Sequence, residues 1–536
     1  MLRFLSKRQS SSQSGPFFVP PPDPFENPLV ETHPGSLRQW VKGLPFANPE
    51  QLAQAVIINL GRLNRFPAPI KRRDELMEIY QSPSARLYHL AQERKSALPL
   101  RLNRQVMQEM AYGYLHLVNH WFGEKPSARR RKELHNHIYQ AIKYLAQEFL
   151  CACLMYDCHG SKTLQEMIRL HTLAEENNLQ LAPVDDAEYA SASITQQLKL
   201  TLLLSLLDPC HLQEDEPRIV FDYLGAYADT AEFIELTANI DPAGRYVIDR
   251  MGEMPPQRFD PGSQEGLATP RFCIFDVLPV SQRLHQDLRS IEKQQAGNPM
   301  GLQHLGIKTA SNLLKRMLKS WHIRLQRDSE RHATSGQAGL TLGLQAIHRF
   351  FSDSTTSVEQ DNGNPQEIDL TLQTGGLNPS GDCASLTLDC WRCNQSRSGV
   401  ALLLTVPQLI TPQVGDLVLL TKTKSRNRSE AKVGVVRRVL LREQSVLEIG
   451  VQFINGRIVP LSMQPLADSE AQAGPGFPAL YIDLGELERS SLLVAKDTLV
   501  INREYRIEEM VPAPSVSPIL LSEVTTTFER YRIKRI

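Results

Sequence analysis

The sequence predicts an α+β protein of several domains, with an all-α part first and an antiparallel β-barrel near its C-terminus. Between residues 36 and 214, apolar side chains recur every three or four positions, which indicates amphipathic helices. After residue 330 they alternate with polar side chains over short runs broken by Gly, Pro and Asn, which indicates antiparallel strands. With 536 residues, the chain is long enough for two to four domains.

The helical part, 36–214, contains recognisable helix starts. Asn48 belongs to the residue types that cap helices, and Pro49 fits the first helical position. Because no fixed repeat period is present, we expect stacked helical hairpins rather than a solenoid. The apolar faces comprise Leu52, Val56, Leu60 and Leu63; Val106, Met110, Tyr114, Leu117 and Trp121; and, after a cap at Ser127, Leu134, Ile138, Ile142, Leu145 and Phe149.

The next segment, 215–322, mixes the two patterns, and we expect a small α/β connector packed on the helices. Its β-like pieces are 245–249 and 271–280, and its helical pieces are 283–294 and 307–321. Both piece types are short, so the connector is expected to be a small structure.

A six-stranded antiparallel barrel is expected over 323–470. A helix-like piece at 344–352 and a polar loop at 353–382 interrupt its strands, so 344–382 is interpreted as an insertion. The final stretch, 471–536, is also strand-rich and is expected to form a β extension that packs against the barrel. The six expected strands are 339–343, 384–391, 398–404, 417–422, 433–441 and 447–453.

The first 35 residues are expected to form a flexible arm. Residues 8–34 are rich in Ser, Gln and Pro, and such a segment buries too little apolar surface to offset the entropy lost on ordering. A peptide that docks on a partner is the alternative for this segment. The start is basic but has no apolar core of a secretion signal, so we expect a cytoplasmic protein.

The composition is that of a globular protein without a strong charge preference. Lys+Arg and Asp+Glu both number 59, which argues against a nucleic-acid binder that relies on a positive field over the whole protein. The longest apolar run, 200–207, is far shorter than the roughly 20 residues of a membrane span. Eight cysteines without regular spacing do not indicate a disulfide framework.

Neither a metal site nor a catalytic centre is expected. The spacing C-x-C-x₄-C-H matches no common structural zinc pattern, and a single C-x-x-C without a second pair does not indicate a redox or metal site. His116 and His120 share a helix face but lack a third ligand, whereas His135 and His137 do not share one. The cysteine-containing candidates are Cys151, Cys153, Cys158 and His159, and the pair Cys390 and Cys393.

Two polar segments frame the start of the expected barrel. Arg327 and Arg331 precede the first strand, and the run Asn394–Gly399 (NQSRSG) joins two later strands. Arginine donates in pairs to phosphate or to guanine O6 and N7, and its plane stacks on a purine ring. Asn and Ser add short donors and acceptors, and Gly399 permits a tight backbone turn beside them. These residue types suit a ligand with two phosphodiesters and two guanines.

In this order, the two segments and the strands after them resemble the PilZ family of cyclic di-GMP receptors, over about residues 325–462. The resemblance implies that Arg327 and Arg331 wrap the ligand, and that Asn394, Ser396 and Gly399 hold a guanine and its phosphate. A second R-x-x-x-R at 438–442 lies within an expected strand, so spacing alone does not identify the site. The matching text is RDSER, WRCNQSRSGVALLL, VGDLVLL, AKVGVVRRVLL and LEIGVQF.

The sequence departs from the family pattern at one point. The family places its two motifs a few tens of residues apart, whereas 62 residues separate Arg331 from Asn394 here. The insertion at 344–382 accounts for this distance.

The expected function is a non-enzymatic, cytoplasmic cyclic di-GMP sensor. Its helical part would relay the signal to a protein partner in motility, pilus or polysaccharide control, without nucleic acid or a membrane span. The alternative is a scaffolding protein whose barrel no longer binds nucleotide. The runs typical of cyclic di-GMP synthesis or breakdown, Gly-Gly-Asp-Glu-Phe and Glu-Ala-Leu, are absent from the sequence.

Overall fold

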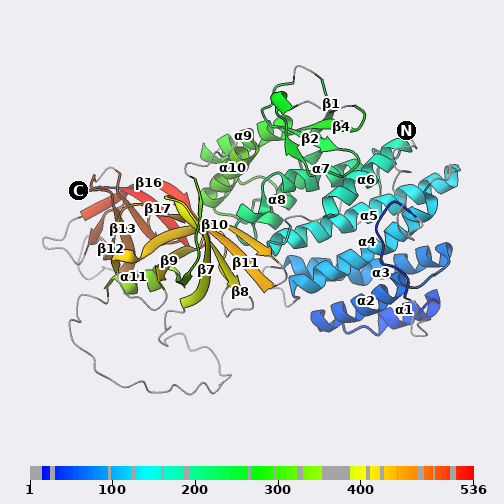
Figure 1. The fold of residues 1–536 in the computed structure, drawn as a ribbon, viewed down its shortest axis with the longest axis horizontal. Helices are drawn as coiled ribbons and strands as arrows, with labels where there is room; N and C mark the ends of the chain where they lie inside the picture. The colour runs from blue at the N-terminus through cyan, green and yellow to red at the C-terminus, as the bar shows by residue number, and fades with distance from the viewer. Residues whose placement is uncertain are drawn as a thin grey trace, which may run out of the picture. The chain divides into compact units, whose positions relative to one another are not determined.

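The computed structural model divides into two compact units, residues 1–325 and 326–536. Figure 1 labels the helices and strands of both units. The structure describes residues 15–23, 31–93, 98–122, 127–158, 162–184, 192–237, 240–263, 267, 269–293, 297–322, 330–352, 387–405, 411–422, 428–442, 445–466, 476–486, 489–507 and 515–535.

Helices dominate the first unit. The Asn48 side chain caps α2 by accepting from Gln51 N at 3.1 Å, with Pro49 at the first helical position, as the sequence predicted. Ser127 and Ser193 cap α5 and α7 in the same way. The helices are α1 (Pro34–Lys42), α2 (Pro49–Asn64), α3 (Ile70–Gln92), α4 (Leu100–Trp121), α5 (Ala128–Leu154), α6 (Thr163–Glu176), α7 (Ile194–Ser205), α8 (Glu216–Gly225), α9 (Leu278–Glu292) and α10 (Ile307–His322).

α5 is the central helix of this unit. All of its residues from His137 to Cys153 are buried, so its C-terminal half has no solvated face. Its buried carboxylate, Glu148, is ion-paired with Arg104 at 2.6 Å and accepts from the Thr163 hydroxyl at 2.6 Å. The apolar stripes of the neighbouring helices pack into one core cluster with it.

A small antiparallel sheet follows the first eight helices. Its strand order is β1-β4-β2-β3, formed by Glu232–Glu235, Phe272–Asp276, Arg245–Asp249 and Gln257–Arg258. One of the two expected β-like pieces, 245–249, is β2, and the other continues from β4 into α9. The expected connector is therefore a sheet with two helices after it.

The second unit opens with the expected six-stranded barrel. β6 (Gln337–Leu342), β9 (Leu417–Lys422), β10 (Lys432–Arg442), β11 (Val446–Phe453), β8 (Gly399–Thr405) and β7 (Thr387–Gln395) pair in that order. Because β7 also pairs with β8 and β6, the sheet closes on itself. β5 (His332–Ala333) is added beside the end of β7.

The expected β extension forms a second closed barrel. Its strands run in the order β12 (Arg457–Pro465), β13 (Phe477–Asp483), β14 (Ser491–Ala495), β17 (Phe528–Arg535), β16 (Ser515–Val524) and β15 (Tyr505–Ile507). β12 lies within 323–470, the range predicted for the first barrel, but it pairs with β13 and β15 and so belongs to the second.

The inserted helix α11 (Leu344–Ser352) is buried against both barrels. Its Leu344 and Ile347 share a core cluster with strands of the first barrel and with β13, β14 and β17 of the second. His348 Nε2–H donates to the Leu461 carbonyl of β12 at 3.1 Å. The insertion thus joins the barrels, while its loop, 353–382, lies outside the described residues.

Two further observations bear on the expectations above. None of the helices in the described ranges is long and apolar enough to cross a bilayer. Residues 15–23, within the segment expected to be a flexible arm, pack on the helical unit, where Phe17 is fully buried.

Replacing Ile347 by Ala should loosen both barrels. Its side chain is fully buried, and truncating a buried Ile to Ala typically costs about 2–5 kcal/mol. Hydrogen exchange should accelerate in β9 and in β13, since both contribute to the shared cluster. The exposed neighbour Gln345→Ala is the control and should leave exchange unchanged. Faster exchange in only one barrel would contradict a joining role for α11.

The buried His171 should make the helical unit sensitive to acid. Burial, and then Arg250 and Lys199, lower its pKa to about 3, so the folded state keeps it neutral. In the unfolded chain its pKa is about 6.5, so acidification below that value favours unfolding. One such group removes about 2 kcal/mol between pH 7 and pH 5. In urea titrations, His171→Gln should lose stability less steeply over this range; parallel profiles would contradict the assignment.

Candidate functional site

The two polar segments singled out in the sequence meet at the end of β7. On one edge, β7 pairs with β8; on the other, it pairs with β6 along 387–391 and with β5 at its last two residues. His332 lies opposite Gln395, and Ala333 lies opposite Asn394. This antiparallel register brings Arg331 beside the turn that follows β7.

Arg331 is exposed and forms no ion pair within the described part of the chain. Its guanidinium therefore remains available to an anion at this junction. Arg327, the other predicted arginine, lies outside the described residues.

The turn between β7 and β8 is a tight hairpin. Ser396 N donates to the Gly399 carbonyl at 2.8 Å, and the Ser396 hydroxyl donates to the same oxygen at 3.4 Å. Arg397 stands exposed at the tip. From the next strand, Phe453 N donates to the Ser398 carbonyl at 2.9 Å, which fixes the hairpin to β11.

Asn394 follows a β-bulge. The register of β7 with β8 shifts between Arg392 and Asn394, which leaves Cys393 as the extra residue. A bulge re-aims the side chains beside it, and bulges are common next to binding sites. Asn394 Oδ1 is buried and has no hydrogen-bond partner within the described ranges.

Two more buried polar atoms at this junction lack a partner among the described residues. They are Thr334 Oγ1 and Arg392 Nε. The backbone places both beside Asn394, since Thr334 N donates to Cys393 O at 3.2 Å and Arg392 N to Gly336 O at 2.9 Å. Buried polar groups are nearly always hydrogen-bonded, so this cluster is suited to a polar ligand. Sequence reasoning missed Thr334, because only strand pairing brings it to the site, and it gave no role to Arg392, which lies two residues before Asn394 on the same strand.

Gly399 has a steric role. A Cβ at this position would lie 2.4 Å from the Val451 carbonyl oxygen, a backbone atom of the paired strand β11. No residue with a side chain fits there without moving β8 away from β11. The glycine is thus required by close strand approach.

The second arginine pair has a different environment. Arg438 and Arg442 both ion-pair with Glu448 on β11, at 3.3 and 2.5 Å. Both guanidinium groups are therefore already ion-paired, whereas Arg331 forms no ion pair within the described residues.

The C-x-x-C pair shows no activated thiol. Cys390 is buried, its thiol donates to Ala338 O at 3.2 Å, and burial raises its pKa to about 12. Burial also raises the pKa of Cys393. Reactive cysteines have lowered pKa values, so neither thiol is set up for redox chemistry.

The helical cysteines that the structure describes are buried or half-buried thiols. No group of three potential ligands is found among the residues described. Cys151 accepts from Asn103 at 3.2 Å, and burial raises its pKa to about 12. Cys158 lies 3.9 Å from Cys210, and His159 is outside the described residues.

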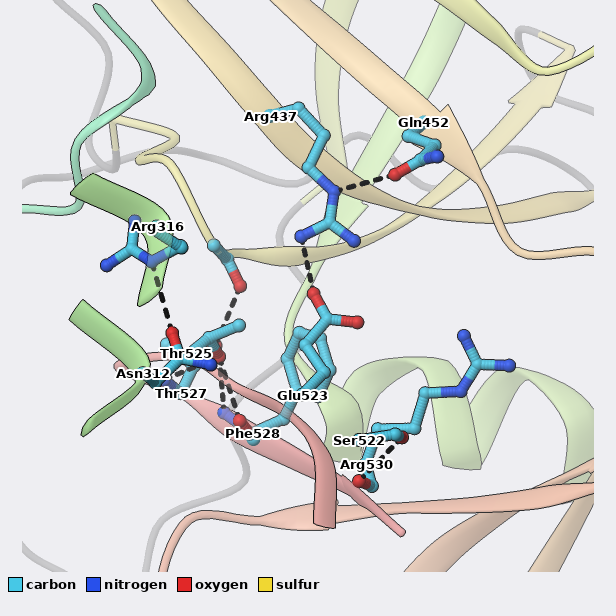
Figure 2. A network of polar contacts seen from close by, with 11 residues as sticks. Asn312, Arg316, Arg437, Gln452, Ser522, Glu523, Thr525, Thr527, Phe528 and Arg530 are labelled. Carbon is cyan, nitrogen blue, oxygen red and sulfur yellow. Dashed lines mark hydrogen bonds and ion pairs between the residues drawn. The ribbon is translucent and has the colours of Figure 1, made fainter. Parts of the chain in front are cut away.

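Polar side-chain contacts connect β10 and β11 of the first barrel with the second barrel. Figure 2 shows Arg437 of β10 donating to Gln452 of β11 at 2.8 Å and ion-paired with Glu523 of β16. Gln452 pairs in register with Gly399. A second contact between the barrels is the Thr527 hydroxyl donating to Gly415 O at 3.4 Å.

Comparison with known proteins gives two family matches. Residues 35–238 match the N-terminal domain of the cyclic-di-GMP receptor FimW, and residues 247–375 match its middle PilZ domain. The second match includes the arginine segment, β5, β6 and α11, and ends before the Asn394–Gly399 run. No curated protein matched the chain.

Replacing Gly399 by Ala should disrupt the hairpin, because the added methyl would clash with Val451 O. Forced overpacking of this kind costs about 1–3 kcal/mol. Hydrogen exchange should accelerate at 399–402 and 449–452. Gly450→Ala is a matched control on β11, since its Cβ would meet only Arg438 Cβ at 3.4 Å. Equal effects of the two substitutions would contradict the steric role of Gly399.

Proposed function

Because the chain belongs to the PilZ-domain family of cyclic di-GMP receptors, we propose that it binds cyclic di-GMP where β5 meets the β7–β8 hairpin. The ligand contacts are Arg327, Arg331, Asn394, Ser396 and Gly399. The observation that carries this proposal is the pairing of β5 with β7, which brings together Arg331 and Asn394, residues that are 63 positions apart in sequence.

The chemistry of the junction suits this ligand. Arg331 offers a planar fork for a phosphodiester or for guanine O6 and N7. Asn394 Oδ1, unpaired among the described residues, is an acceptor for guanine N–H groups, and the Ser396 hydroxyl can donate to phosphate if it rotates away from the Gly399 carbonyl. Ligand binding would satisfy buried atoms that otherwise lack partners, which favours the bound state.

We further propose that the protein is a cytoplasmic effector without catalytic activity. In this proposal, ligand binding orders the segment carrying Arg327 and Arg331, and the helical unit passes the signal to a protein partner. Ordering of a loop by new charge pairs is a known switching mode. The Arg437–Glu523 ion pair supports transmission within the second unit, because it joins the strands beside the hairpin to the second barrel.

Calorimetry should show micromolar or tighter binding of cyclic di-GMP to the full chain. Arg331→Ala should weaken binding by about 1.5–3 kcal/mol, or roughly 10- to 150-fold, the value of a hydrogen bond to a charged group. Arg442→Ala is the matched control: it removes an arginine of the same spacing pattern that is already paired with Glu448, so affinity should not change.

No heat at high micromolar ligand would overturn the proposal and favour a scaffolding barrel instead. Normal binding by Arg331→Ala would reject this arginine as a contact.

A further inference from the structure

The segment 15–23 is held on the helical unit as a bound peptide would be. It forms neither helix nor strand, and it is the dark blue segment in Figure 1. Phe17 is 0% exposed and belongs to the main core cluster, whereas its neighbour Phe18 is 50% exposed. One aromatic side chain therefore anchors the segment.

The Asn119 side chain of α4 forms hydrogen bonds with the backbone of Phe17. Its Nδ2 donates to the Phe17 carbonyl at 2.9 Å, and its Oδ1 accepts from Phe17 N at 3.1 Å. Asn119 is itself 8% exposed, so both bonds lie in a desolvated environment. A carboxamide used in this way recognises any extended peptide backbone, and the amino acid at this position is selected only by the pocket that receives its side chain.

Two residues of the segment, three positions apart, are buried. Phe17 and Pro20 are buried, while Phe18 and Pro21 are exposed. The prolines at 20–22 restrict the unbound conformations, which lowers the entropy lost on binding.

Further contacts extend the bound region to three helices. The Phe18 ring meets the Tyr112 ring of α4 edge-on, with centroids 5.8 Å apart. Arg169 of α6 donates to the Pro16 carbonyl at 3.5 Å, and Asp23 N donates to the Arg65 carbonyl after α2 at 3.0 Å. Apart from the Phe18 ring, these contacts also use backbone atoms of the segment.

We infer that this surface is a peptide-binding groove, and that its partner is a protein segment with an aromatic residue three positions before a proline. The chain's own residues 15–23 occupy the groove until such a segment displaces them. A tethered segment competes at an effective concentration of about millimolar, so a partner must bind tightly or be held nearby. This inference is independent of cyclic di-GMP binding.

Exchange of the segment can be tested with a fluorescent peptide of residues 14–24, SGPFFVPPPDP. In full-length Phe17→Ala, the chain's own anchor is removed and the groove is left open. The peptide should bind this variant at least about 10-fold more tightly than wild type, as measured by fluorescence anisotropy. Phe18→Ala is the matched control and should behave more like wild type, since Phe18 is half exposed.

Two additional variants test the recognition itself. A peptide with Ala at the Phe17 position should not bind, and the double variant Phe17→Ala, Asn119→Ala should lose affinity for the original peptide. If Phe17→Ala keeps its helical circular dichroism but does not bind the peptide at 1 mM, residues 15–23 are a fixed part of the fold. That result would overturn the inference.

A second measurement covers the case in which Phe17→Ala does not fold. A peptide carrying a benzophenone at the Phe17 position is irradiated with the wild-type protein at millimolar concentration. Crosslinks should fall on α4 near Asn119 and should decline when unlabelled peptide is added. Crosslinks that map elsewhere, or none at all, would also overturn the inference.

Discussion

The hydrogen bonds of β7 are the constraint on which the second unit depends. This strand closes the first barrel by pairing with β8, continues the sheet through β6 and holds β5 at its end. Because β5, β6 and β8 all pair with it, the same strand closes the barrel and holds the candidate site together. The bulge at Cys393 lies where the partner changes from β6 to β5, and it re-aims Asn394 at that point.

The insertion between the two halves of the site is explained by the same topology. The chain leaves the first barrel after β6 and re-enters it at β7. Between these two strands, α11 buries Ile347 in a cluster shared with the second barrel. The long separation of Arg331 and Asn394 in sequence therefore does not separate them in space. It adds an apolar contact that makes the second barrel part of the site's framework, together with the Arg437–Glu523 ion pair.

Local sequence patterns predicted the helices and strands well, whereas the pairing of the strands could be predicted only in part. The alternation of apolar and polar residues correctly predicted β9 at 417–422. The repeat of apolar residues every three or four positions correctly predicted α11 at 344–352. Both patterns are contained in short stretches of sequence. Closure of the second barrel depends on β12 joining β15, and Thr334 reaches the site only through β5. Composition suggested a flexible arm, but one buried phenylalanine and one asparagine hold residues 15–23 on the helices.

The two candidate binding surfaces differ in how their polar groups are satisfied, and this determines how each can respond. At the barrel junction, Asn394 Oδ1, Thr334 Oγ1 and Arg392 Nε are buried without partners in the described structure, so a ligand would add bonds that these atoms do not make there. At the groove, Asn119 already has both of its bonds. A partner there only exchanges one set of bonds for an equivalent set. The junction is thus suited to detect a small molecule directly, while the groove responds only to a partner that outcompetes a tethered segment.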